Sequence, residues 1–292
     1  MFVATLVASD VLGQGDISSA ADRLAHAGCT VGARTELDPG KAADIMFEGV
    51  AGAARAALAG INGIDSIIQP VATREKKLLI ADMDSTMITI ECIDELADYA
   101  GIKPQIADVT ERAMRGELDF AEALSARVAL LAGLEEKMID ICRAERVKIM
   151  PCAKALVQTM RARGAKTILV SGGFTRFADP VGAEIGFERV VANVLGLAEG
   201  KLTGEVEFPI VDSARKKQEL EAALAAHGID HLLSLAVGDG ANDIPMIQAA
   251  GLGVAYHAKE KTREAADAEI RFGNLAALLY AQGIARKDWV IA

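Results

Sequence analysis

The sequence predicts an α/β protein with a doubly wound parallel-sheet core, a helical cap inserted into that core, and a small α+β domain in front of it. Three observations support this prediction. From residue 75 onward, short apolar runs alternate with helical patterns, which is typical of parallel strands buried on both faces. A mostly helical segment, at about residues 90–150, separates the first two of these runs. The first 74 residues contain strands and helices of their own in another order.

Residues 1–74 are predicted to form a βαββαβ domain. An apolar strand precedes an amphipathic helix that stops at Gly28, and two strands flank the turn Asp38-Pro39-Gly40. An Ala-rich helix and a last strand complete the order, which is the split, ferredoxin-like pattern. By this order the domain resembles the amino-acid-sensing ACT family. We find no ligand motif in it, and we expect any homo-oligomer to form through it.

Residues 75–292 are predicted to form the second domain. The charged stretch at residues 74–77 marks the boundary between the two domains. The strands of the second domain are expected in the apolar runs at residues 77–84, 167–173, 232–240 and 252–256. The cap should contain a helix that begins after Asp119, because Glu122 stands three residues on and completes a capping box. Residues 193–208 are predicted to form a β-hairpin with Glu199-Gly200 at its turn.

Composition limits the classes of partner. The 292 residues carry 41 acidic against 31 basic side chains, a net charge of −10, whereas binding to nucleic acid or to an anionic membrane favours a basic face. No apolar stretch reaches the ~18 residues of a membrane span, and the first residues lack the basic region of a secretory signal. Four scattered cysteines without a Cys-x-x-Cys pair predict reduced, buried thiols. We therefore expect a cytoplasmic protein that binds neither nucleic acid nor membrane.

Four motifs follow the predicted core strands or lie in the loops beyond them, where open α/β sheets bind their ligands. Each alone has an ordinary interpretation as a turn, a helix cap or a solvated helix. Two aspartates directly after a buried strand, however, cost folding free energy unless a cation lies beside them. In this order, the four together indicate one site. They are Asp82-Met83-Asp84-Ser85-Thr86, Ser171-Gly172-Gly173, Lys216, and Gly238-Asp239-Gly240-Ala241-Asn242-Asp243.

These motifs resemble the motif set of the haloacid dehalogenase superfamily, and within it the phosphoserine phosphatases, over about residues 77–270. The resemblance implies Mg²⁺-dependent hydrolysis of O-phosphoserine through an aspartyl-phosphate, the last step of L-serine biosynthesis. It makes Asp82 the nucleophile and Asp84 the general acid and base. It assigns Mg²⁺ to Asp82, Asp239 and the backbone carbonyl of Asp84, with Asp243 holding a metal-bound water. It implies that Lys216, Ser171 and the Gly172 N–H hold the phosphoryl oxygens, and that Asn242 contacts the phosphate or the bound substrate.

The cap supplies the residues that would select the substrate. By the same resemblance, Glu91 would bind the substrate ammonium and Arg127 its carboxylate, while Met114 and Phe120 would make apolar contacts. Ordinary alternatives remain for each of them: a helix-start acid, a surface arginine, and helix packing. Two other functions also remain open. One is a phosphatase or phosphotransferase for another small phosphomonoester, and the other is an amino-acid-responsive regulator with a vestigial site.

Overall fold

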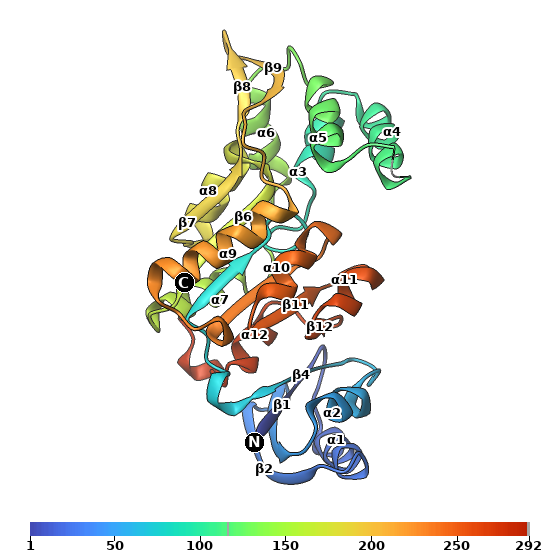
Figure 1. Cartoon of the computed structure of the whole chain (residues 1–292), viewed down its shortest axis with the longest axis vertical. Coiled ribbons are helices and arrows are strands. Elements are labelled where there is room, and N and C mark those ends of the chain that lie inside the picture. Colours follow the sequence, from blue (N-terminus) through green and yellow to red (C-terminus); the bar gives the residue numbers. More distant parts are fainter. Residues whose placement is uncertain (116, 291–292) are drawn as a thin grey trace.

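The computed structural model describes residues 1–115 and 117–290. Three parts follow one another along the long axis of the molecule (Figure 1). The N-terminal sheet lies at one end, the parallel sheet lies in the middle, and the cap helices with a β-hairpin lie at the other end. No helix in the described residues combines the length and the apolar character needed to cross a bilayer.

The N-terminal part is an antiparallel sheet of order β2-β3-β1-β4 covered by two helices. Successive side chains of a strand point to opposite faces of the sheet. Leu6 of β1 accordingly packs in a cluster with residues of both helices, while the next residue, Val7, belongs to the core of the C-terminal part. The predicted βαββαβ order is confirmed, with β1 Phe2–Ala8, α1 Gln14–His26, β2 Thr30–Asp38, β3 Ala42–Glu48, α2 Ala51–Leu58 and β4 Ile64–Pro70.

The central sheet has six parallel strands in the order β12-β11-β10-β5-β6-β7. Three of its inner strands, β5, β10 and β11, are buried along their whole length, as their continuous apolar runs predict. The strands are β5 Leu78–Ala81, β6 Lys166–Phe174, β7 Arg189–Asn193, β10 Ser234–Gly238, β11 Leu252–Tyr256 and β12 Ala268–Ile270. The two edge strands, β7 and β12, are not among the predicted runs.

Helices cover both faces of this sheet, so the predicted doubly wound core is confirmed. Leu78 and Ile80 of β5 pack with α9 and α10, whereas Leu79 and Ala81 belong to the cluster that includes α7, α8 and α12. These helices are α7 Ala153–Ala162, α8 Thr175–Ile185, α9 Ser213–His227, α10 Ile244–Ala249 and α12 Ala276–Ala281, and α11 Glu260–Ala265 lies between β11 and β12.

The insertion between β5 and α7 is helical, as predicted. The Asp119 and Glu122 side chains cap its third helix by accepting each other's backbone N–H at 2.8 and 2.9 Å. A hairpin formed by β8 and β9 turns at residues 199–200, both with positive φ, and pairs with the cap through the Gly133 N–H and the Leu202 carbonyl. The elements are α3 Cys92–Tyr99, α4 Lys103–Met114, α5 Phe120–Ala129, α6 Lys137–Arg146, β8 Leu195–Ala198 and β9 Lys201–Val206.

The contact between the N-terminal sheet and the core is built from buried charge as well as apolar packing. Arg74 forms a 2.8 Å ion pair with Asp44 and also donates to the carbonyl of Ala281. Asp65, which is 3% exposed, accepts hydrogen bonds from three consecutive N–H groups after β12, including that of Gly273 at 2.7 Å. Both groups lose most of their hydration, so these bonds fix the N-terminal sheet on the core.

Candidate active site

The carboxyl ends of two adjacent strands bring the predicted aspartates together. β5 and β10 are parallel neighbours in which Ala81 pairs with Val237. Asp82 follows the first of these residues, and Asp239 stands two residues after the second. The turn beyond Asp239 then leads into α10 and carries Asp243. The fold therefore places acidic groups from distant parts of the chain at one edge of the sheet.

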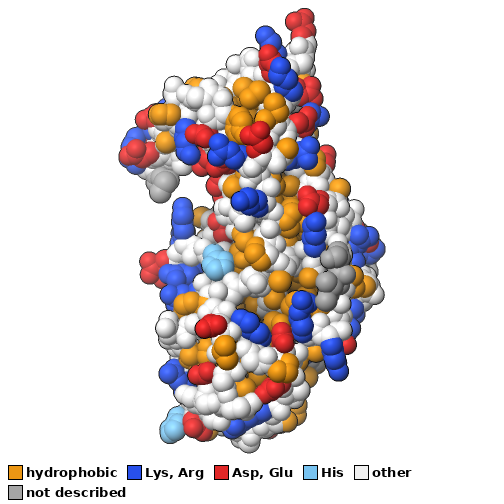
Figure 2. Space-filling model, turned by 180° about the vertical axis from the view of Figure 1, so that it is seen from behind, with side chains coloured by type: hydrophobic (Ala, Val, Ile, Leu, Met, Phe, Trp, Pro, Cys, Tyr) orange, Lys and Arg blue, Asp and Glu red, His pale blue; other side chains and the backbone are white. Residues whose placement is uncertain are grey.

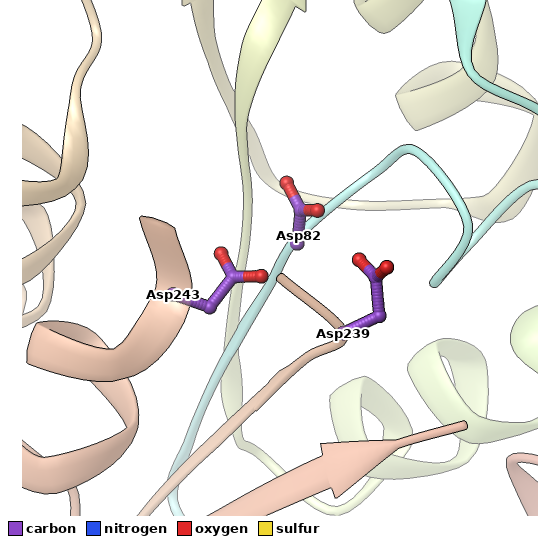
Figure 3. A group of neighbouring side chains, drawn as sticks. All are labelled: Asp82, Asp239 and Asp243. Carbon is purple, nitrogen blue, oxygen red and sulfur yellow. The ribbon is translucent and has the colours of Figure 1, made fainter. Parts of the chain in front are cut away.

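Three of these carboxylates form a group that could hold a metal ion. One oxygen each from Asp82, Asp239 and Asp243 lies within 4.8 Å of the others. Figure 3 shows the three side chains converging from the end of β5 and from the segment after β10. An all-oxygen donor set of this charge suits a hard divalent cation.

Lys216 lies directly behind this group. Its side chain is fully buried, and its Nζ lies 2.5 Å from Asp82 Oδ1 and 2.7 Å from Asp243 Oδ1. Lys216 stands in the first turn of α9. The helix begins after its N-cap residue Asp212, whose side chain accepts a hydrogen bond from the Arg215 N–H. Burial would lower the pKa of Lys216, but the two carboxylates outweigh burial and raise it above its ordinary value. Lys216 is therefore a permanent cation in the site.

Burial also changes the acidity of the aspartates. It raises the pKa of Asp84 to about 7, with the nearby charge of Glu91 adding to the effect. Burial and Asp243 together raise the pKa of Asp239 to about 7. The pKa of Asp82 is likewise raised, mainly by burial and by Asp243, while Lys216 opposes the shift. Asp84 Oδ1 has no hydrogen-bond partner among the described residues, so this buried oxygen is available for a ligand.

The end of β6 contributes two closely packed glycines. Ser171 Oγ accepts the Gly173 N–H at 2.9 Å. A Cβ added to Gly172 would come within 3.2 Å of the Phe120 ring, and one added to Gly173 would come within 3.3 Å of Asp84 Oδ2. Side chains at these two positions would crowd the site, which accounts for the glycines after Ser171.

A cavity of about 540 Å³ lies between the cap and these loops. In Figure 2 the cap overhangs the body of the molecule, and the surface is hollowed between them. Most of the predicted site residues line this one cavity, whereas Lys216 and Asp243 lie behind it. Met114 is the last residue of α4, and its side chain lies outside the described part of the structure. The predicted residues on the cavity wall are Asp82, Asp84, Glu91, Phe120, Arg127, Ser171, Gly172, Asp239 and Asn242.

The two predicted substrate-selecting residues face this cavity from the cap. Glu91 is the N-cap residue of α3, and its Oε1 accepts the Ser85 hydroxyl at 2.6 Å. Arg127 is half-buried, and its Nε donates to the Ala123 carbonyl one turn earlier at 3.2 Å. Burial lowers the pKa of Arg127 from its ordinary value. Arg127 therefore lies on the cavity wall, and its role toward a substrate carboxylate stays a prediction.

Comparison with known proteins agrees with this geometry. The model of the haloacid dehalogenase-like hydrolase family matches residues 79–248, which include all four motifs. This chain belongs to the haloacid dehalogenase-like hydrolase family. The family predicted from the motifs and the fold class are thus both confirmed.

Three relatives of this chain are informative. The phosphoserine phosphatase of Albidiferax ferrireducens is 45% identical over 221 residues, which cover 74% of this chain and 93% of that protein. The phosphoserine phosphatase of Streptomyces coelicolor is 44% identical over 74% of this chain, but the chain spans only 52% of its length. A crystal structure described as a probable phosphoserine phosphatase from Vibrio cholerae, in unliganded form, has 32% identity and a TM-score of 0.78. The match covers 98% of this chain and 88% of the Vibrio cholerae chain.

Sequence reasoning missed four residues of this site. Asn193, which is buried, links the Gly172 carbonyl to the Val211 N–H through hydrogen bonds of 2.8 and 2.7 Å. No local pattern marks it, because its two partners lie 21 and 18 residues away. Asp94, Thr110 and Lys259 also line the cavity. Asp94 stands three residues after Glu91 in the first turn of the same helix, a spacing that could have signalled it.

Proposed function

We propose that this chain hydrolyses O-phosphoserine to serine and inorganic phosphate, in a Mg²⁺-dependent reaction. The observation that carries the proposal is the pairing, in one cavity, of the Asp82 and Asp84 carboxyl groups with Glu91 and Arg127. A phosphate ester of an amino acid needs a nucleophile and an acid at one end and a charge-complementary pair at the other. Relatives named phosphoserine phosphatase, at about 44% identity, support the same substrate.

The reaction begins with Asp82, whose carboxylate attacks phosphorus and forms an aspartyl-phosphate as the bond to the serine oxygen breaks. Asp84 gives its proton to that leaving oxygen. A pKa of about 7 lets Asp84 carry the proton near neutral pH and then remove one from the water that hydrolyses the aspartyl-phosphate. Lys216 neutralises charge on Asp82 and on the phosphoryl group.

The remaining polar groups bind the phosphate. Ser171 and the Gly172 N–H are proposed to contact phosphoryl oxygens, and Asn242 the phosphate or the bound substrate. Phe120 closes the cavity next to Gly172 and helps to exclude water, and Met114 is proposed to share this role.

The donor set fits Mg²⁺, which would be held by Asp82, Asp239 and the Asp84 backbone carbonyl. Asp243 would lie behind these ligands, because Lys216 engages its Oδ1 and the Gly240 N–H engages its Oδ2 at 3.0 Å. When bound, the ion supplies a positive charge that polarises the phosphoryl group.

The test is phosphate release by the purified chain from O-phosphoserine and from a panel of other small phosphate esters. Chelation of divalent metal should abolish release, and added Mg²⁺ should restore it. Full turnover after chelation would contradict the metal assignment. An equal rate on every ester would favour a general phosphomonoesterase, and no release from any ester would favour a regulator with a vestigial site.

Replacing Arg127 tests the substrate assignment itself. A guanidinium binds a carboxylate through two parallel hydrogen bonds. Arg127→Ala should therefore lower kcat/KM for O-phosphoserine by about 10- to 150-fold. p-Nitrophenyl phosphate lacks the carboxylate and should lose little. The ratio between the two substrates cancels general damage to the fold, and equal losses on both would contradict a carboxylate-binding role.

We further propose that the enzyme acts in the cytoplasm and that any homo-oligomer forms through the N-terminal sheet. Its outer strand β2 has five consecutive exposed residues, 32–36, at the free edge of that sheet. Sedimentation of the full chain tests this, and a concentration-independent monomer would exclude the oligomer.

A further inference from the structure

A second carboxylate faces the substrate-selecting end of the cavity. Asp94, in the first turn of α3, lines the cavity together with Glu91 and Arg127. Its side chain is half-buried and has no hydrogen bond or ion pair among the described residues. Asp98, the next aspartate along the helix, instead pairs with Arg146 outside the cavity at 3.5 Å. Asp94 is therefore a carboxylate on the cavity wall that no described residue pairs with.

The positive charge on the same cavity wall, that of Arg127, is also available for a ligand. Arg127 forms no ion pair within the described residues, and its one hydrogen bond uses Nε, so its two terminal nitrogens remain for an anion. Asp94 is near enough to raise the pKa of Arg127 against the effect of burial, yet the two do not form a salt bridge. An unpaired cation and an unpaired anion that share one cavity match the zwitterionic end of an α-amino acid, whose ammonium and carboxylate groups are attached to the same carbon.

Counting hydrogen-bond donors and acceptors shows why a bound ammonium group would need a second carboxylate beside Glu91. An ammonium group has three N–H donors, and each should be satisfied when the group leaves water. Glu91 has already committed Oε1 to the Ser85 hydroxyl. Asp94 has two carboxylate oxygens and no protein donor among the described residues.

We propose that Asp94 is a specificity-determining residue that, together with Glu91, accepts hydrogen bonds from the substrate's ammonium group. The inference rests on the proposed function, because it takes an amino-acid phosphate as the occupant of the cavity. It adds that selection requires a positive charge on the substrate, held by two carboxylates.

The test is Asp94→Asn, a nearly isosteric change that removes the charge, assayed on four phosphate esters with the full-length, Mg²⁺-loaded chain. O-phosphoserine has both an ammonium and a carboxylate, phosphoethanolamine only the ammonium, phosphoglycolate only the carboxylate, and p-nitrophenyl phosphate neither. We expect kcat/KM to fall about tenfold or more for the two ammonium esters. The two esters without an ammonium should change by less than about twofold, since a neutral amide leaves the rest of the cavity intact.

Each other outcome overturns the proposal in a recognisable way. Equal losses on all four esters would make Asp94 structural, and no loss on any would remove it from recognition. Losses confined to the two carboxylate esters would show that Asp94 acts through Arg127. The matched control is Asp98→Asn, which removes an acid from the same helix outside the cavity and should leave all four values unchanged.

The wild-type chain separates failure of this inference from failure of the proposed function. If it hydrolyses O-phosphoserine no better than p-nitrophenyl phosphate, the proposed function is wrong. The comparison of phosphoethanolamine with p-nitrophenyl phosphate in Asp94→Asn still shows whether this carboxylate recognises an ammonium.

Discussion

Asp82→Asn should lower kcat for O-phosphoserine by at least about 10³-fold, the scale of loss seen when a covalent nucleophile is removed. An amide nitrogen or oxygen cannot replace the carboxylate as the attacking group. The fold should survive, because asparagine has almost the same shape and its carbonyl oxygen can still accept the hydrogen bond that Lys216 donates to Asp82. Single-turnover assays, with thermal unfolding as a check on the fold, measure both expectations.

A matched control is Asp10→Asn, which makes the same chemical change at an exposed position after β1. It should leave kcat unchanged. A second readout is trapping by beryllium fluoride, a phosphoryl mimic that binds a nucleophilic aspartate. The wild type should be trapped and Asp82→Asn should not. Activity of Asp82→Asn within tenfold of the wild type would mean that another group attacks phosphorus.

The sequence was most informative where burial is uniform. β5, β10 and β11 are covered on both faces, so nearly every residue must be apolar, and the resulting runs are visible without a structure. The edge strands lack this signal. β12 has only three residues, and β7 is mostly half-exposed, so neither produces a continuous apolar run.

The site could be predicted to the extent that it depends on strand ends. Asp82 and Asp239 had to meet, because parallel neighbours end at the same edge of a sheet. The burial of Lys216 could not be foreseen, since its run of three cations is equally typical of a solvated helix. Asp44 and Asp65 gave no sign of their burial for a related reason: their partners lie 30 or more residues away.

Lys216→Met should show how strongly the site depends on its buried cation. Methionine has a similar length and no charge, so Asp82 and Asp243 would be left buried without the ammonium that lies within 2.7 Å of both. Removing one partner from a buried ion pair costs about 3–5 kcal/mol of unfolding free energy. We expect a loss of this size in urea unfolding without divalent metal, together with loss of phosphate release.

The loss of stability should depend on pH. Burial and Asp243 already raise the pKa of Asp82, and Lys216 is the neighbour that opposes them, so its removal should raise this pKa further. A carboxyl whose folded pKa lies above its unfolded value destabilises the fold when it is ionised, and the penalty disappears as it takes up a proton. The difference between variant and wild type should therefore be largest near neutral pH and shrink as the pH falls.

Lys217→Met is the matched control, because Lys217 is the adjacent residue of α9 and forms an exposed pair with Glu221 at 3.6 Å. Exposed pairs of this kind contribute about 0–1 kcal/mol, so this variant should unfold almost like the wild type. If Lys216→Met cost no more than Lys217→Met, the two carboxylates would not depend on Lys216 for their charge balance. If the cost were large but independent of pH, lost packing rather than uncompensated charge would be its cause.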